Sequence, residues 1–119
     1  MAEAAKLKTK ANEAFGLKSF AKAAALYTEA LVAEASPKFA CLILLNRGFT
    51  SFKAHRITDA EHDFVKCEEI GELPPRLEVK LYYRLGLCAL AQRKTTQAEA
   101  FCDRSNLRAS TLQLPGEIE

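Results

Sequence analysis

Two cations, Lys80 and Arg84, stand four residues apart in the stretch that runs from Lys80 to Gly86. On a helix this spacing places both cations on the same face, one turn apart. No acidic residue lies between them, so this face could receive the carboxylate of a ligand. A Lys/Arg pair at this spacing is also typical of a solvated helix face. If the pair binds a ligand, the rest of the chain must place further ligand-binding residues opposite it. If the pair lies on a solvated face, nothing need lie opposite it.

The composition is typical of a single helical domain. Of the 119 residues, 49% are apolar and 27% are charged, while glycine (5) and proline (4) are scarce. This balance favours helices over strands. The net charge of +2 is too small to indicate a nucleic-acid partner. No apolar stretch approaches the ~20 residues of a membrane span, and the N-terminus lacks the apolar segment of a signal peptide.

The four cysteines are widely spaced, with no C-x-x-C pair and no histidine at metal-ligand spacing. They are Cys41, Cys67, Cys88 and Cys102. Each stands where a helix would favour a small apolar side chain, so we expect buried, reduced thiols rather than disulfides or zinc ligands. We therefore predict a cytoplasmic protein with no metal site and no cofactor.

An internal repeat organises the chain. An alanine followed four positions later by an aromatic or similar residue occurs three times, and a small residue precedes each alanine by 12 positions. The three sets are Ala11, Ala23 and Tyr27, then Gly48, Ala60 and Phe64, then Gly86, Ala98 and Cys102. The alanines are 37 and 38 residues apart. This constant offset indicates three similar units, in each of which two helices approach closely.

Each unit is predicted as a helix, a short break and a second helix. Apolar residues recur at three- and four-residue spacing, and Pro37, Gly71 and Pro74-Pro75 separate the units. Thr58, with Glu61 three residues later, is a candidate capping box for the fourth helix. The predicted helices are residues 3–16, 20–34, 39–53, 58–70, 77–91 and 95–109. The units span about residues 3–36, 38–72 and 76–110, and residues 111–119 are expected to form a flexible tail.

Three helix pairs with these key positions resemble the tetratricopeptide repeat, and the resemblance covers about residues 3–110. It implies an all-α fold in which three helix-turn-helix repeats stack as a right-handed superhelix, an α-solenoid. The first helix of each pair would line a concave groove. Domains of this family usually add a seventh helix over the last repeat, for which the residues after Ala109 are too few. Either the chain has been cut from a longer protein, or the tail or a neighbouring molecule covers the apolar face of the last repeat.

Aligning the units on their small residues places cations, carboxamides and apolar rings in this groove. The predicted lining residues are Lys8, Asn12 and Phe15 from unit one, Asn46, Phe49, Phe52 and Lys53 from unit two, and Lys80, Tyr83, Arg84 and Leu87 from unit three. Lysine supplies a point charge, arginine two parallel N–H donors, and asparagine donates without adding repulsion. This set fits the capture of two carboxylates, as at a peptide C-terminus with an acidic last residue. The apolar residues could hold an aliphatic side chain just upstream.

The polar members of this set are similar to the dicarboxylate clamp of co-chaperone tetratricopeptide domains. The family has Lys and Asn in repeat one, Asn in repeat two, and Lys and Arg in repeat three. Without substitution, these positions match Lys8, Asn12, Asn46, Lys80 and Arg84. The resemblance implies that the ligand is the C-terminal Glu-Glu-Val-Asp of cytosolic heat shock protein 90 or heat shock protein 70.

Some residues of the groove leave two interpretations open. Phe49 and Phe52 stand where relatives often have small residues, so their rings either narrow the pocket or pack against neighbouring helices. Lys53 either contacts the peptide or lies free on the surface. Arg47 is expected to be solvated.

The main functional prediction is a peptide-binding adaptor that recruits a cytosolic chaperone, and the alternative is an assembly scaffold that holds an internal segment or a folded partner. No enzyme is predicted, because no Ser/His/Asp arrangement, glycine-rich phosphate loop or metal spacing occurs. His62 and Asp63 are expected to be structural or on the surface. The chain ends in Glu117-Ile118-Glu119, which crudely imitates the chaperone ligand. Weak self-association is therefore a further hypothesis, through this tail or through the uncapped last repeat.

Overall fold

The computed structural model describes residues 2–34 and 36–111, and the chain divides into two compact units, Met1–Glu72 and Leu73–Glu119. The first unit contains α1 (Ala2–Gly16), α2 (Phe20–Ala33), α3 (Pro37–Lys53) and α4 (Ile57–Ile70). The second unit contains α5 (Pro75–Ala91) and α6 (Thr95–Thr111). Within the described ranges all regular structure is helical. The predicted all-α class is confirmed, and every predicted helix end lies within two residues of the observed one.

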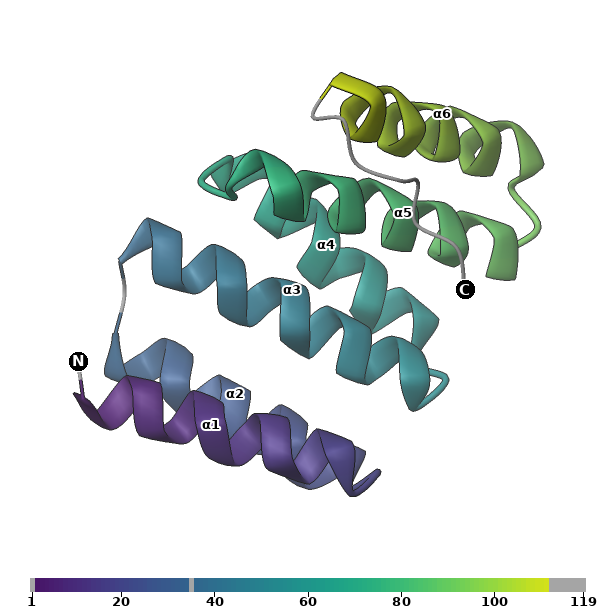
Figure 1. Ribbon diagram of the computed structural model, residues 1–119. Helices are drawn as coiled ribbons and strands as arrows, with labels where there is room; N and C mark the ends of the chain where they lie inside the picture. The colour runs from purple at the N-terminus through teal and green to yellow at the C-terminus, as the bar shows by residue number, and fades with distance from the viewer. Residues whose placement is uncertain (1, 35, 112–119) are drawn as a thin grey trace. The chain divides into compact units, whose positions relative to one another are not determined.

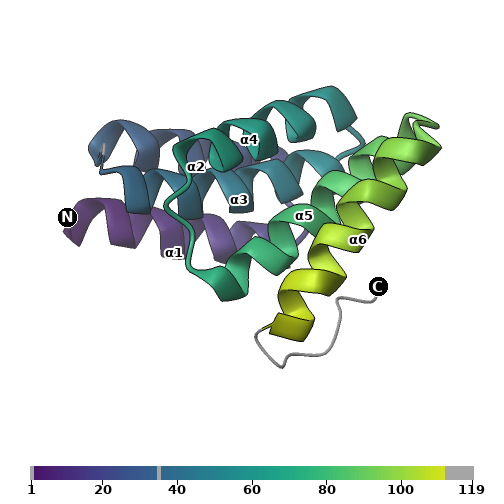
Figure 2. The same cartoon turned by 90° about the horizontal axis from the view of Figure 1, so that it is seen from above.

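Consecutive helices pack as antiparallel pairs, α1 with α2, α3 with α4, and α5 with α6. Within the first unit α2 also packs on α3. In Figure 1 the helices α1 and α3 of that unit lie in front of α2 and α4 and run in the same direction. Figure 2 shows the same pairs from above. The first helix of each pair in this unit thus contributes to one common face.

The three turns within the pairs have the same backbone form. Their middle residues, Lys18, His55 and Arg93, have φ values of 62°, 65° and 60°, in the left-handed region that non-glycine residues seldom adopt. In each turn, the N–H of the following residue donates to a carbonyl five positions earlier. These bonds are Ser19 to Ala14 (2.9 Å), Arg56 to Ser51 (2.8 Å) and Lys94 to Ala89 (2.8 Å). The shared turn satisfies a helix-end carbonyl in each pair and repeats along the chain as the sequence predicted.

The capping box predicted at Thr58 is wrong. Helix α4 begins at Ile57, its N-cap is Arg56, and no side chain caps it. The tight turn at His55 brings the chain into helical conformation one residue earlier than expected, so Thr58 already lies inside the helix. A side-chain cap does occur at α3, where Ser36 accepts a hydrogen bond from the Phe39 N–H at 3.4 Å and Pro37 occupies the first turn.

The core contains the repeat residues that the sequence singled out. Ala11, Ala23 and Tyr27 are buried between α1 and α2, and Ala60 and Phe64 are buried between α3 and α4. The close approach is tightest at the glycines. A Cβ on Gly48 would lie 2.6 Å from Phe64 Cε1, and one on Gly86 would lie 3.3 Å from Cys102 Sγ. Small residues are therefore required where the two helices of a pair touch.

Three of the four cysteines are buried, and the expectation that all four would be buried is wrong for Cys102, which is exposed. All four are free thiols. Between α3 and α4, Cys67 Sγ donates to the Cys41 carbonyl at 3.4 Å and Cys41 Sγ donates to the Cys67 carbonyl at 3.8 Å. Burial, with Cys41 beside it, raises the pKa of Cys67 from 9.0 to about 12.

We expect Cys102 alone among the four thiols to react rapidly with a thiol reagent at pH 8 in the native protein. Burial excludes the reagent from the other three, and the raised pKa of Cys67 leaves almost no reactive thiolate at this pH. The same shift stabilises the fold below about pH 9, and this contribution is lost as the pH rises toward 12. Mass spectrometry of labelled protein, with Cys102→Ser as control, measures the rapid phase. Rapid labelling that persists in Cys102→Ser would contradict the burial.

Two further observations limit the chemistry of the described residues. None of their helices is long and apolar enough to cross a membrane. They also contain no group of three or more histidine, cysteine, aspartate or glutamate side chains that could hold a metal ion. The predicted tail ligand, Glu117 to Glu119, lies outside the described residues, and self-association stays a prediction.

Candidate functional site

The carboxamide of Asn12 has a defined partner within the first unit. Asn12 is exposed on α1, one turn after the half-buried Lys8. The hydroxyl of Tyr27, a residue of α2 that is 2% exposed, donates a hydrogen bond to Asn12 Oδ1. The bond therefore crosses the α1–α2 pair and fixes a polar side chain on the face that α1 contributes.

Aromatic rings from α1 and α3 meet on this unit. The Phe15 ring contacts Phe49 at a centroid distance of 5.8 Å, and Phe49 stacks on Phe52 at 6.3 Å with an interplanar angle of 6°. Phe15 also makes an edge contact with Phe20 at 5.6 Å. The two rings of α3 thus pack against helix neighbours, which is one of the two interpretations that the sequence left open. Together Phe15, Phe49 and Phe52 form what we call the aromatic cluster.

Lys53 lies at the edge of the aromatic cluster. Its ammonium nitrogen is 5.1 Å from the centroid of the Phe49 ring, while the side chain stays exposed. A cation over a ring face at this distance is attracted by the ring quadrupole. Lys53 therefore places a positive charge beside an apolar surface, where it remains accessible to solvent.

The aromatic contact also defines how the two asparagines relate to each other. Asn12 precedes Phe15 by three residues, and Asn46 precedes Phe49 by three. Because α1 and α3 run in the same direction (Figure 1), one turn back from the Phe15–Phe49 contact reaches Asn12 on one helix and Asn46 on the other. Each asparagine is therefore about one helical turn from the ring contact between Phe15 and Phe49.

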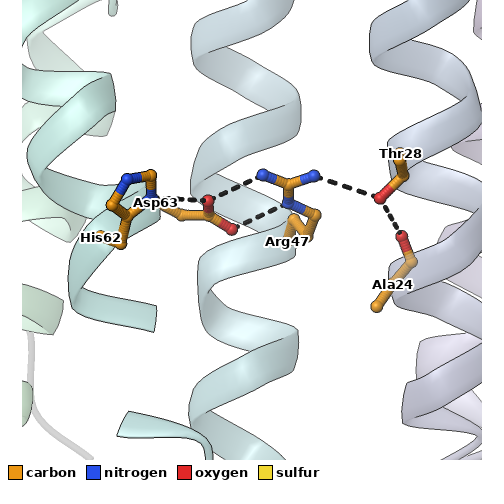
Figure 3. A network of polar contacts seen from close by, with 5 residues as sticks. All are labelled: Ala24, Thr28, Arg47, His62 and Asp63. Atoms are coloured by element: carbon orange, nitrogen blue, oxygen red, sulfur yellow. Dashed lines mark hydrogen bonds and ion pairs between the residues drawn. The ribbon is translucent and has the colours of Figure 1, made fainter. Parts of the chain in front are cut away.

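Arg47, the residue after Asn46, joins three helices instead of being solvated as the sequence suggested (Figure 3). Its Nε and Nη2 donate to the two carboxylate oxygens of Asp63 on α4, at 2.9 Å and 2.8 Å. Its Nη1 donates to Thr28 Oγ1 on α2 at 3.1 Å. We call Arg47, Asp63 and Thr28 the arginine brace. Asp63 is buried, so the expectation that it is structural fits this contact.

The arginine brace depends on an ion pair between α3 and α4, and its hydrogen bond to Thr28 links α3 to α2 as well. The hydrogen bond with Asp63 is the largest cause that raises the pKa of Arg47 above its ordinary value, against the opposing effect of burial. Two parallel N–H donors on one carboxylate define the direction of the guanidinium. Since Asn46 is adjacent to Arg47 on α3, the brace also holds in place the part of α3 that carries Asn46.

The second unit carries the remaining predicted site residues on α5. Lys80 is exposed, whereas Tyr83, Arg84 and Leu87 are half-buried. Two contacts with α6 hold this helix beside Lys80. Ser105 Oγ donates to the Val79 carbonyl at 2.9 Å, and Arg108 pairs with Glu78 at 3.3 Å. The cation pair of α5 is therefore presented by an anchored helix.

Several predicted ligand-binding side chains are not used by the fold. Among residues 2–34 and 36–111, no hydrogen bond or ion pair engages the side chains of Lys8, Asn46 and Lys80. Lys8, Asn12 and Asn46 belong to the first unit, and Lys80 and Arg84 belong to the second. The first three residues thus lie on α1 and α3 of one unit, the two helices whose rings Phe15 and Phe49 are in contact.

Two functional features were missed by sequence reasoning. Tyr27 was counted only as a packing residue, although a tyrosine hydroxyl at a buried repeat position needs a hydrogen-bond partner. That need was the signal that could have revealed the contact with Asn12. Arg47 gave a weaker signal, because its partner Asp63 is 16 residues away in the sequence.

Within the described residues, six helices form three antiparallel pairs, and a small residue of the first helix packs against the second helix in each pair, which is the arrangement of a tetratricopeptide repeat fold. Solved structures agree. The first TPR of Spaghetti (RPAP3), bound to HSP90 peptide SRMEEVD, is 24% identical to this chain, with a TM-score of 0.76 over 89% of this chain and 79% of that one. The Sgt2 TPR domain from Aspergillus fumigatus is 25% identical, with a TM-score of 0.77 over 92% of this chain and 68% of that one. No protein-family model and no curated protein matches the chain. The chain therefore has the tetratricopeptide repeat fold that its sequence resembled.

Proposed function

We propose that this chain is a peptide-binding adaptor of the co-chaperone type, which captures an acidic C-terminal tail through a dicarboxylate clamp. The proposed ligand is the Glu-Glu-Val-Asp end of heat shock protein 90, of heat shock protein 70, or of both. One observation carries the proposal: the five clamp positions are filled by the expected residue types on first helices of a tetratricopeptide fold. That a protein of the same fold was solved with HSP90 peptide SRMEEVD supports it.

In this proposal, the roles of the five residues follow from their chemistry. Lys8, Asn12 and Asn46 bind the main-chain carboxylate at the end of the peptide. Lys80 and Arg84 bind the side-chain carboxylate of its last aspartate. Ammonium and guanidinium groups supply charge-assisted hydrogen bonds, and carboxamides add N–H donors without repelling the cations.

Apolar residues are proposed to contact the peptide just upstream of its acidic end. From the first unit these are the aromatic cluster, with Lys53 beside it, and from the second unit Tyr83 and Leu87. The rings of Phe49 and Phe52 already stack on each other, so the peptide would lie against the outer side of the stacked pair instead of entering a pocket between the rings. Lys53 would then meet an upstream glutamate.

We expect the peptide SRMEEVD to bind, and amidation of its terminal carboxylate to weaken binding strongly. Lys8→Ala and Arg84→Ala should each cost about 1.5–3 kcal/mol, the range for a hydrogen bond to a charged group. Affinity should also fall as salt is raised, because the contacts are charge-assisted and partly exposed. Calorimetric titration of each variant with the free-acid and amidated peptides measures these effects.

Charge-matched controls separate contact from general attraction. Lys10→Ala and Arg76→Ala remove one exposed cation each from α1 and α5, outside the predicted clamp, and should leave affinity nearly unchanged. If amidation has no effect, the clamp is wrong and the assembly scaffold, which needs no free C-terminus, becomes the better description.

The choice between the two chaperones is proposed to depend on residues upstream of the shared acidic end. Titration with the two chaperone tails side by side tests this choice. Both chaperones are cytosolic in this proposal, so the adaptor would act in the cytoplasm, where free thiols such as those of Cys41 and Cys67 are stable.

A further inference from the structure

The hydrogen bond between Tyr27 and Asn12 decides which end of the Asn12 carboxamide faces a ligand. The carboxamide has an acceptor oxygen on one side and an NH₂ group with two donors on the other. Since the Tyr27 hydroxyl donates to Oδ1, the oxygen is directed toward α2. The NH₂ group is then left on the exposed side of α1, where Asn12 is accessible.

Tyr27 keeps its proton and so remains a donor. Burial raises the pKa of Tyr27 above its ordinary value of 10.0, so the phenol stays neutral throughout the physiological range. The neutral hydroxyl of Tyr27 is therefore always available as a hydrogen-bond donor. The amide oxygen of Asn12 can accept this hydrogen bond, whereas the amide NH₂ group fits the hydroxyl less well because it is itself a donor.

Packing alone does not explain a tyrosine at this position. In the second repeat the corresponding residue is Phe64, whose buried ring packs against Gly48 without a hydroxyl. A phenylalanine would thus serve the same packing role against Ala11. A buried hydroxyl is an additional polar group that must be satisfied, and in this chain it is satisfied by a residue of the proposed clamp.

We propose that Tyr27 is a positioning residue that holds Asn12 as a hydrogen-bond donor, so that the site selects a terminal carboxylate over a terminal amide. This inference rests on the proposed peptide-binding function. A carboxylate offers only acceptors, which match the outward NH₂ group. An amidated terminus replaces one of the two carboxylate oxygens by an NH₂ group, and where this group faces the NH₂ group of Asn12 the two donors form no bond.

Removing the hydroxyl should reduce the selection of the free acid over the amide while the protein stays folded. In Tyr27→Phe the ring remains, but the Asn12 carboxamide is free to rotate by half a turn and to offer its oxygen to an amidated peptide. We expect affinity for the free-acid peptide SRMEEVD to fall about 3- to 10-fold, the range for one ordinary hydrogen bond. The ratio of free-acid to amide affinity should fall with it, because the amidated peptide loses less.

The experiment measures both peptides against four proteins: the natural sequence, Tyr27→Phe, Asn12→Ala and the double variant. Circular dichroism and thermal unfolding of each protein check that it is folded. The hydroxyl should matter only when Asn12 is present, so Tyr27→Phe should change neither affinity in the Asn12→Ala background. Asn12→Asp, which keeps an acceptor for Tyr27 but has no donor, should bind the free acid more weakly than Asn12→Ala does.

The outcomes separate this inference from the function on which it rests. If the natural sequence does not bind the peptide, or does not distinguish acid from amide, the proposed function itself fails. If it distinguishes them and Tyr27→Phe keeps the same ratio, the function stands and the positioning role is overturned. If Tyr27→Phe is unfolded, the aspartate variant decides, since tight binding of the free acid by Asn12→Asp also overturns the role.

Discussion

Replacing Arg47 by alanine is expected to lower the free energy of unfolding by about 3 kcal/mol, which is the low end of the cost of breaking a buried ion pair. Asp63 is 6% exposed, and its carboxylate would lose the two N–H donors that now satisfy its oxygens. Arg47 is 25% exposed, so the low end of the range applies. Urea unfolding followed by circular dichroism measures this change.

The two partners of the arginine brace should not be equivalent. Asp63→Ala leaves Arg47, whose side chain can turn toward solvent, and should therefore cost less than Arg47→Ala. Arg47→Lys keeps the charge but loses the paired donors, so its cost should lie between zero and that of Arg47→Ala. Equal stability of Arg47→Ala and the natural sequence would mean that the brace contributes nothing to the fold.

Gly48→Ala is expected to destabilise the protein by about 2 kcal/mol, whereas Gly86→Ala is expected to be neutral or slightly stabilising. The added methyl at position 48 would lie 2.6 Å from a ring carbon of Phe64, which is fully buried and cannot move aside. Overpacking of this kind costs roughly 1–3 kcal/mol or more, and the better helix propensity of alanine returns about 1 kcal/mol.

Gly86 is the matched control for this experiment. The nearest atom to its added methyl is Cys102 Sγ at 3.3 Å, and Cys102 is exposed, so a small rotation relieves the contact. The helix propensity gain then remains. Thermal and urea unfolding of both variants measure the difference between them. If both glycines tolerate alanine equally, the steric explanation of the repeat is wrong.

The helices and their repeat could be predicted because they depend on local spacing. The offsets among small, alanine and aromatic positions predicted the six described helices and the three breaks within the helix pairs. Helix starts were less well predicted. Thr58 looked like a cap because its side chain suits one, but the turn at His55 starts α4 one residue earlier.

Contacts between helices were predicted less well than the helices. The sequence shows neither that Arg47 reaches Asp63 nor that Tyr27 reaches Asn12, because each pair is joined by packing and separated by at least 15 residues. The exposure of Cys102 had a similar cause. Cys102 occupies the repeat position that the buried Tyr27 and Phe64 fill in the other units, which predicted burial, but its exposure depends on packing between helices and Cys102 is exposed.

The arginine brace also distinguishes the α3–α4 pair from the α5–α6 pair. Repeat proteins contain similar helices that can pair with the wrong neighbour during folding. At the positions of unit three that correspond to Arg47 and Asp63 stand Leu85 and Phe101, so an exchange of α4 for α6 would place the guanidinium of Arg47 against an aromatic ring. Such an exchange would replace the two charge-assisted hydrogen bonds of Arg47 by a weaker contact with a ring, and it would leave the buried Asp63 without its donors. A single ion pair thus marks which two helices of this repetitive chain belong together.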